Sequence, residues 1–122
     1  MSPLSLEELA RRRPVWLAMS DMFLDTDTES SRQGRADALE KSGYSMAELD
    51  GILIDEVSPV CGVNLFSATG VWAGFDAEWL EQTILRKRQS SFRWLRRLLS
   101  RQMGKLVADE WEATKQLMGK PR

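Results

Sequence analysis

The sequence contains no histidine and has one cysteine, Cys61, among its 122 residues. Without histidine the chain has no Ser-His-Asp or Cys-His nucleophile system, no histidine acid–base catalyst and no imidazole metal ligand. One cysteine excludes a disulfide within the chain and a cysteine-rich zinc module. In its apolar stretch the thiol is expected to be buried and inert. These absences argue against an enzyme, and we expect neither a metal nor any other cofactor.

Long apolar runs are also missing, since no stretch approaches the ~18 consecutive apolar residues of a membrane span. The opening MSPLSLEELARRR is amphipathic and unlike a secretory signal peptide. Hydrophobic residues make up 43% of the chain and charged residues 29%, which is typical of a globular protein. We therefore expect one cytoplasmic domain spanning residues 1–122, with no membrane partner.

Charge is distributed unevenly between the two halves of the chain. Residues 1–60 contain twelve acids and six bases, whereas residues 61–122 contain six acids and eleven bases. No acid lies between Glu81 and Asp109, a stretch that holds eight bases. Such an asymmetry bears on partners rather than on the fold.

Capping signals predict where the helices begin. Ser5 with Glu8, and Ser45 with Glu48, have the spacing of a capping box, in which each residue satisfies a backbone N–H of the other. Asp76 is predicted to cap a further helix. Residues 30–42 are predicted as an exposed helix that buries little, and Gly43 can end it with a positive φ.

Two prolines are predicted to interrupt helices. Pro14 should kink or stop the first helix, or else begin a new one, just before the apolar run 15–24 that is expected to form the central helix. Ser58-Pro59 is predicted to end the helix that starts after Ser45, because proline pushes the preceding residue out of the helical region.

The remaining segments complete an all-α prediction. Residues 60–75 are apolar but glycine-rich and show neither a helical nor a strand period, which favours a loop packed across one end of the molecule over the alternative, a short strand pair. The apolar spacing over 91–118 predicts a last helix that either runs unbroken or breaks at Gly104. We predict a single-domain bundle of five or six helices with the packed glycine-rich loop at 60–75.

Four short motifs carry a resemblance to a known family. They are Phe23-Leu24-Asp25-Thr26, Ser42-Gly43-Tyr44-Ser45, Glu56-Val57 with Pro59, and Gly70-x-Trp72-x-Gly74-Phe75-Asp76. With these motifs the chain resembles a family of small bacterial proteins known as a domain of unknown function. The resemblance covers roughly residues 12–85 and does not include the basic C-terminal helix. It implies a helical, bacterial, cytosolic protein, and it transfers no catalytic residue.

The alternating acids Asp25, Asp27 and Glu29 look like the start of a calcium loop. Such a loop needs a central glycine and a final glutamate, and those positions hold Ser30 and Ala36. We therefore predict no metal site here and interpret the acids as helix-end capping.

Carboxylates on the helix that follows Ser45 form the first candidate surface. Glu48 and Asp55 lie seven residues apart on a similar helix face, with Glu56 beside them. A catalytic pair would need burial or a neighbour that separates the two pKa values. We interpret these acids as a solvated face or as one side of a partner surface, with Asp55 and Glu56 as candidate partner-binding residues.

A basic run with an interleaved tryptophan forms the second candidate surface. Its members are Arg93, Trp94, Arg96, Arg97 and Arg101. Arginine and tryptophan are enriched at protein-interface hot spots. Phosphate contacts and base stacking on nucleic acid, an anionic membrane surface, and pairing with the acids of residues 1–60 remain alternatives. Trp16 and Trp79 lie on apolar stripes and are predicted to be core residues.

These patterns favour a non-enzymatic protein-binding module of the immunity or antitoxin type, which neutralises a toxin by occluding it. The alternative is a nucleic-acid-associated regulator that uses the basic helix 86–105. A sequence pI near 5.5 disfavours that alternative. An enzyme of unrecognised type that uses carboxylates is the third reading, and the oligomeric state is left open.

Overall fold

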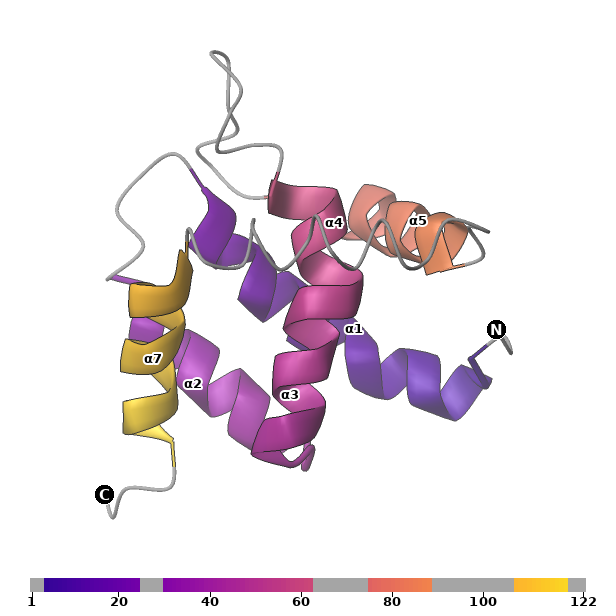
Figure 1. The fold of residues 1–122 in the computed structure, drawn as a ribbon. Coiled ribbons are helices and arrows are strands. Elements are labelled where there is room, and N and C mark those ends of the chain that lie inside the picture. Colours follow the sequence, from indigo (N-terminus) through magenta and orange to yellow (C-terminus); the bar gives the residue numbers. More distant parts are fainter. Residues whose placement is uncertain (1–3, 25–29, 63–74, 89–106, 119–122) are drawn as a thin grey trace.

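The computed structural model describes residues 4–24, 30–62, 75–88 and 107–118 (Figure 1). Within these ranges the chain is helical and has no strand, which confirms the all-α prediction. The α-helices are α1 (Leu6–Ser20), α2 (Arg32–Lys41), α3 (Met46–Ile52), α4 (Ser58–Cys61), α5 (Ala77–Arg88) and α7 (Ala108–Leu117). A 3-10 turn, η1 (Asp21–Phe23), follows α1, and a π-helical segment, η2 (Leu53–Val57), joins α3 to α4.

The helices pack around α1, which contacts α2, η2 and α5. In Figure 1 the run α3–η2–α4 rises through the centre, with α2 and α7 beside each other on one flank and α5 on the other. The fully buried side chains include Trp16, Met19 and Phe23 from α1 and η1, and Leu80 from α5. The apolar run 15–24 therefore supplies the centre of the core, as its composition predicts.

The three predicted N-caps form, but of the Ser5–Glu8 capping box only the Ser5 half does, since the Glu8 carboxylate bonds Arg12 and Tyr44 instead. The Ser5 hydroxyl accepts a hydrogen bond from the Glu8 N–H at 3.1 Å, and α1 begins at Leu6. Ser45 and Glu48 form both bonds of a capping box, at 3.1 and 2.9 Å. The Asp76 carboxylate accepts a bond from the backbone N–H three residues later at 2.8 Å. Each cap satisfies an N–H that the first turn of a helix leaves without a partner.

The prolines do not end their helices. Pro14 lies inside α1, which continues to Ser20. The prediction that Ser58-Pro59 ends the preceding helix is wrong, because the chain stays helical from Met46 to Cys61. Pro59 has no N–H to donate, and the wider π turn before it, closed by the Ser58 N–H on the Leu53 carbonyl, accommodates this.

Two further predictions about segments need revision. Val60 and Cys61 end α4 and are not part of a loop; residues 63–74 of the predicted loop lie outside the described ranges. The last helix begins at Ala108 after Val107, whose ψ of 11° is not helical. The unbroken helix over 91–118 is therefore wrong, while Gly104 lies outside the residues that the structure describes.

Candidate functional site

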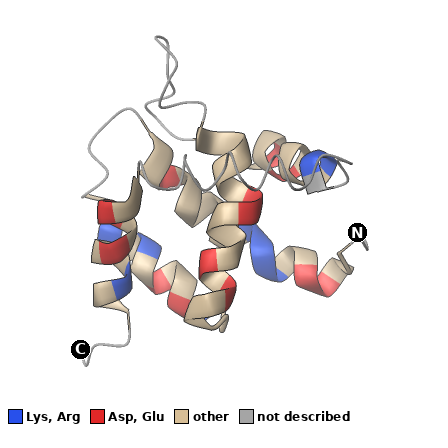
Figure 2. Ribbon diagram, in the orientation of Figure 1, with Lys and Arg blue, Asp and Glu red and all other residues tan. Residues whose placement is uncertain are grey.

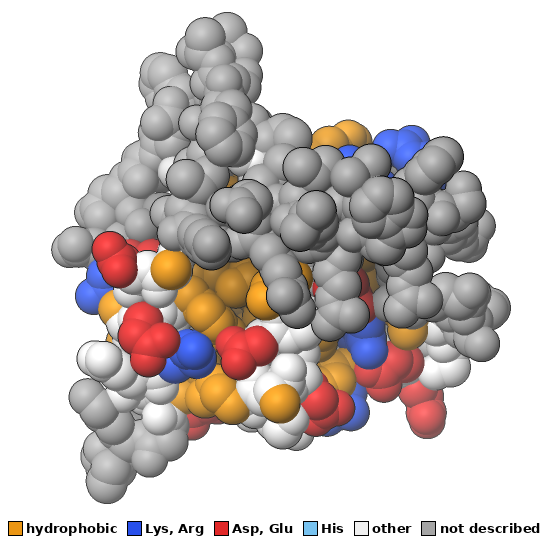
Figure 3. Space-filling model, viewed as in Figure 1, with side chains coloured by type: hydrophobic (Ala, Val, Ile, Leu, Met, Phe, Trp, Pro, Cys, Tyr) orange, Lys and Arg blue, Asp and Glu red, His pale blue; other side chains and the backbone are white. Residues whose placement is uncertain are grey.

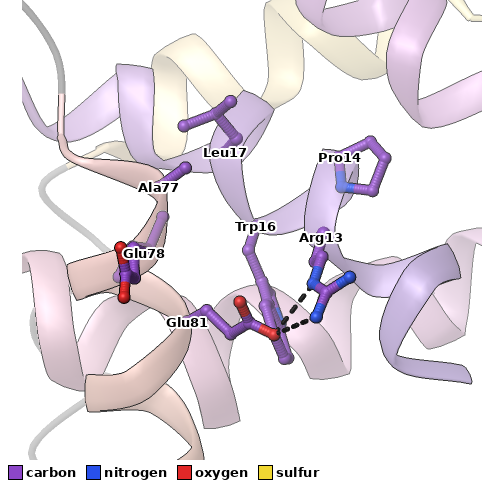
Figure 4. Close-up of a pocket in the computed structure, with 8 residues that line it drawn as sticks. Arg13, Pro14, Trp16, Leu17, Ala77, Glu78 and Glu81 are labelled. Atoms are coloured by element: carbon purple, nitrogen blue, oxygen red, sulfur yellow. Dashed lines mark hydrogen bonds and ion pairs between the residues drawn. The ribbon is translucent and has the colours of Figure 1, made fainter. Parts of the chain in front are cut away.

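A cleft of about 420 Å³ lies between α1 and α5 (Figure 4). It is lined by Arg13, Pro14, Trp16, Leu17, Ala77, Glu78, Leu80 and Glu81. An ion pair crosses it, because the Arg13 guanidinium contacts the Glu81 carboxylate through two nitrogens, each at 2.8 Å. The volume lies within the range typical of ligand pockets, roughly 300–1,000 Å³.

The cleft is apolar at its floor and at part of its mouth. Trp16 and Leu80, each 1% exposed, close the floor from the two helices, whereas Leu17 is 41% exposed. Each helix contributes two adjacent residues and the two residues one turn later, which is the spacing that places side chains on one helix face. Figure 4 shows the side chains of Leu17 and Ala77 approaching each other from the two helices.

Trp79 is on the surface, and its prediction as a core residue is wrong. It is 46% exposed, and its ring stacks on Phe75 with centroids 6.1 Å apart. Trp79 directly precedes Leu80 in the sequence, but consecutive residues lie about 100° apart around a helix. Leu80 therefore faces the core while Trp79 faces outward. Trp16 and Trp111, at 1% and 6% exposure, are in the core. Within the described part of the chain, Trp79 is thus the tryptophan available to a partner.

Glu56 belongs to the interior of the molecule rather than to a solvated face, so that interpretation is wrong. The residue is 6% exposed. Its carboxylate accepts a hydrogen bond from the Trp16 indole N–H at 2.7 Å and forms an ion pair with Arg12. A buried charge requires such partners. Asp55, its neighbour in η2, is partly exposed.

The same network extends to the turn before α3. Arg12 also bonds Glu8, at 3.1 Å, and Glu8 accepts a hydrogen bond from the Tyr44 hydroxyl. The Tyr44 bond is the largest cause that holds the pKa of Glu8 below its ordinary value. Arg11 lies over the Tyr44 ring at 3.9 Å and donates to the Ser42 carbonyl at 2.7 Å. The motif residues Tyr44 and Glu56 therefore join α1 to the segments on either side of α3.

A second charged network joins α2 to α7. Arg35 is 2% exposed and donates to Glu110 at 2.5 Å and to the Thr114 hydroxyl at 3.0 Å. Arg32 binds both oxygens of the same Glu110 carboxylate, at 2.6 and 2.9 Å. Burial lowers the pKa of Arg35, and Glu110 opposes that shift. The helix over 30–42, predicted to bury little, thus contains a fully buried guanidinium.

The sequence offered one faint signal for Arg35. Arg35, Ala36 and Leu39 have the spacing of one helix face, and all three are buried. Arginine is nevertheless among the residues least often buried, so a pattern based on apolar side chains passes over it. Its partners Glu110 and Thr114, far along the chain, explain why it is inside.

The second candidate surface lies outside the described residues. Arg93, Trp94, Arg96, Arg97 and Arg101 all fall between residues 89 and 106, so the structure does not place them. Of the basic helix 86–105 it describes the beginning, where Lys87 donates to the Pro59 carbonyl at 3.1 Å. The predicted roles of these residues stay predictions.

Acidic side chains spread over one face of the described molecule. Figure 2 shows Asp and Glu along α2, α3 and α7 and at the start of α1. In the space-filling view of the same face, described acids extend from α7 across α3 toward the first turn of α1 (Figure 3). The exposed carboxylates of the described residues are those of Glu7, Glu40, Glu48, Asp76, Glu78, Asp109 and Glu112.

Other reactive groups are inaccessible or scattered. Cys61 is fully buried, and burial raises the pKa of its thiol well above the ordinary value. No group of three potential metal-ligating side chains occurs in the ranges that the structure covers. Among these same ranges, no helix combines the length and apolar character needed to cross a bilayer.

These features define a small all-α domain whose helices are joined by buried ion pairs and whose described surface carries many carboxylates. The chain belongs to the family described as Domain of unknown function (DUF7079), whose model matches residues 10–117. The match confirms the resemblance to a family without an assigned function, and it extends through α7, beyond the 12–85 expected from the motifs. No curated protein and no solved structure matches the chain.

Proposed function

We propose that this protein is a non-enzymatic protein-binding module of the immunity or antitoxin type, which neutralises a toxin by covering a cationic surface of it. The observation that supports this proposal is the division of charge between the inside and the outside of the molecule. Arginines of α1 and α2 bond to other helices, and among the described residues seven carboxylates are exposed against four basic side chains, those of Arg11, Arg13, Lys41 and Arg86.

The arginines serve the fold. Arg12 binds Glu56 of η2, Arg13 binds Glu81 of α5, and Arg35 binds Glu110 of α7. Each of these bonds crosses from one helix to another, so each guanidinium is held by a neighbour within the molecule. Arg12 and Arg35 in particular are shielded, with side-chain exposures of 19% and 0%.

The carboxylates are arranged differently. The exposed acids lie at helix starts and on outward faces, as at Glu7, Glu48 and Asp109. Their summed field attracts a cationic protein over distances up to the Debye length, about 8 Å at physiological ionic strength. Charge complementarity of this kind speeds association and rejects partners of the wrong sign. Occlusion of a cationic site needs only such a surface and no catalytic group.

Co-expression with candidate toxins tests the proposal. The genes that flank this one are expressed singly in a bacterial host, with and without this protein, and colony numbers are counted. We expect one of them to arrest growth, and this protein to restore growth and to co-purify with the toxin. The triple variant Glu7→Lys, Glu40→Lys, Glu48→Lys should lose the rescue, whereas the same sites changed to Gln should lose it only in part. Rescue that survives charge reversal would contradict a charge-steered mechanism.

The second candidate is a nucleic-acid-associated regulator that uses the basic helix 86–105. The observation that favours it is the stretch of eight bases without an acid between Glu81 and Asp109. Binding to nucleic acid would weaken steeply as salt is raised, since neutralised phosphates release counterions. A mobility shift on generic DNA at ~150 mM salt, lost when Arg93, Arg96, Arg97 and Arg101 are changed to Glu, would establish this function instead.

A further inference from the structure

We infer that the cleft between α1 and α5 is the pocket for an anchor side chain of the protein partner, an apolar residue flanked by lysine or arginine. This inference rests on the proposed function, because it names the part of a cationic partner that this chain would hold. It goes further in assigning a place: the four-residue faces of α1 and α5 that line the cleft.

The shape of the cleft suits a side chain. Its volume is about 420 Å³, and Pro14, Leu17 and Ala77 give it apolar walls that are open to solvent. Trp16 and Leu80 belong to the core and are buried, so the floor is backed by packed side chains. An apolar anchor placed there would move part of its surface out of water and into contact with the apolar atoms of the cleft, which favours binding.

The charges around the cleft select the neighbours of that anchor. The lining contains one arginine and two glutamates, so its net charge is −1. Arg13 is engaged with Glu81 at 2.8 Å. Glu78 is exposed and accepts a hydrogen bond from Gln82 at 3.3 Å, and a neutral amide does not balance its charge. A cation beside the anchor would therefore meet a carboxylate at the α5 edge.

The test uses short peptides and the methyl NMR signals of the full chain. The probe is Ac-Lys-Lys-Phe-Lys-Lys-NH2, and two matched peptides replace its Phe by Ser or its four Lys by Glu. We expect the basic Phe peptide to shift the methyl signals of Leu17, Ala77 and Leu80. We expect the Ser peptide to bind about tenfold more weakly or worse, since it lacks the apolar group that the cleft would bury.

The chain offers matched variants on the same helix. Leu6 and Leu17 are both exposed leucines of α1, at 85% and 41%, but only Leu17 lines the cleft. Leu17→Ser should weaken the basic Phe peptide about tenfold, and Leu6→Ser should leave its binding unchanged. For the charge, Glu78→Gln should weaken binding severalfold, whereas Glu7→Gln in the first turn of α1 should not. Circular dichroism confirms that each variant is folded.

Three outcomes would overturn the inference. Equal binding of the Phe and Ser peptides, with shifts away from the cleft, would show that cations bind elsewhere, and the proposed function would stand without this pocket. Equal binding of the acidic Phe peptide would remove the role assigned to Glu78. No methyl shift at millimolar peptide would refute the pocket outright. Co-expression rescue of a neighbouring toxin, measured separately, reports on the proposed function itself.

Discussion

The α2–α7 junction and the α1–η2 junction are both secured by a buried pair of opposite charges, but the more buried partner differs. Between α2 and α7 the arginine is inside, with Arg35 at 0% side-chain exposure and Glu110 at 12%. Between α1 and η2 the acid is inside, with Glu56 at 6% and Arg12 at 19%. The more buried member of the pair is thus the arginine at the α2–α7 junction and the carboxylate at the α1–η2 junction.

The difference matters because the two charged groups respond differently when a partner is removed. A guanidinium keeps its proton under all ordinary conditions, so a stranded arginine remains a buried charge. A carboxylate is able to bind a proton and become neutral. Glu110 also binds two arginines at once, whereas Glu56 binds Arg12 and a neutral donor, the Trp16 indole. Loss of Glu110 should be the more damaging change, because it takes the bonded carboxylate from Arg35, whose side chain is fully buried, whereas loss of Glu56 takes it from Arg12, whose side chain is 19% exposed.

The largest effect is expected for Glu110→Gln at the α2–α7 junction. The change removes the carboxylate that the buried Arg35 guanidinium bonds directly, and breaking such a buried pair costs about 3–5 kcal/mol of the free energy of unfolding. Urea unfolding followed by circular dichroism measures the change. Glu112→Gln is the matched control, since that side chain is 63% exposed and its ion pair with Lys115 is worth ~1 kcal/mol or less.

A double variant sharpens this first prediction. Arg35→Met combined with Glu110→Leu replaces the pair by apolar groups, which is often neutral or stabilising relative to breaking it. We expect the double variant to be more stable than Glu110→Gln by at least ~2 kcal/mol. If it is no better than the single variant, the damage comes from lost packing and not from the stranded charge.

A smaller loss is expected for Glu56→Gln at the α1–η2 junction. The amide oxygen of glutamine still accepts the hydrogen bond from Trp16, while the ion pair with Arg12 is lost. Loss of a hydrogen bond to a charged group costs about 1.5–3 kcal/mol. Guanidinium unfolding of both glutamine variants under one set of conditions gives the comparison. A loss equal to that of Glu110→Gln would mean that the direction of burial is irrelevant.

Tyr44→Phe should have a modest effect, about 0.5–1.5 kcal/mol at neutral pH, because it removes one hydrogen bond and keeps the ring under Arg11. It should also change the pH dependence of stability. The pKa of Glu8 is lower in the folded protein than its ordinary 4.5, chiefly because of Tyr44. Glu8 therefore stabilises the fold above pH 4.5, and this contribution is lost as the pH falls through the folded-state pKa. The acid-side loss should be smaller in the variant.

Asp21, which interacts electrostatically with Arg35, should give the opposite pH dependence of stability. Burial raises its pKa above the ordinary 3.8. Its contribution is therefore present below pH 3.8 and is lost as the pH rises through the folded-state pKa. Unfolding is measured between pH 3 and pH 7. Asp21→Asn should abolish the loss of stability that occurs as the pH rises, whereas Tyr44→Phe should reduce the loss of stability that occurs as the pH falls. Parallel pH profiles would contradict the two assignments.

The smallest effect is expected outside both junctions, at Trp79. The side chain is 46% exposed and stacks on Phe75, so Trp79→Ala should cost ~1 kcal/mol or less. A thermal melt checks this value. Trp111→Ala is the matched change of a buried tryptophan, and it should cost about 3–5 kcal/mol. A large loss at Trp79 would mean that this tryptophan supports the fold and is not an available contact residue.

The sequence by itself determined where α1, α3 and α5 begin and where α2 ends. Ser5, Ser45 and Asp76 cap the helices predicted for them, and Gly43 has the positive φ, 75°, that its place after a helix requires. These features depend on bonds between residues three or four positions apart, so the local sequence contains all that is needed. The apolar run 15–24 likewise identified the central helix, because with so few polar positions most of its faces must pack against other elements, although Leu17 is 41% exposed.

Only the tertiary structure decided which polar side chains lie inside. Arg35 is buried because of Glu110, 75 positions away, and Glu56 because of Trp16, 40 positions away. Helical periodicity fixes the face on which a residue lies, but not the element opposite that face. For a charged residue that element makes the difference between a solvated group and a buried ion pair.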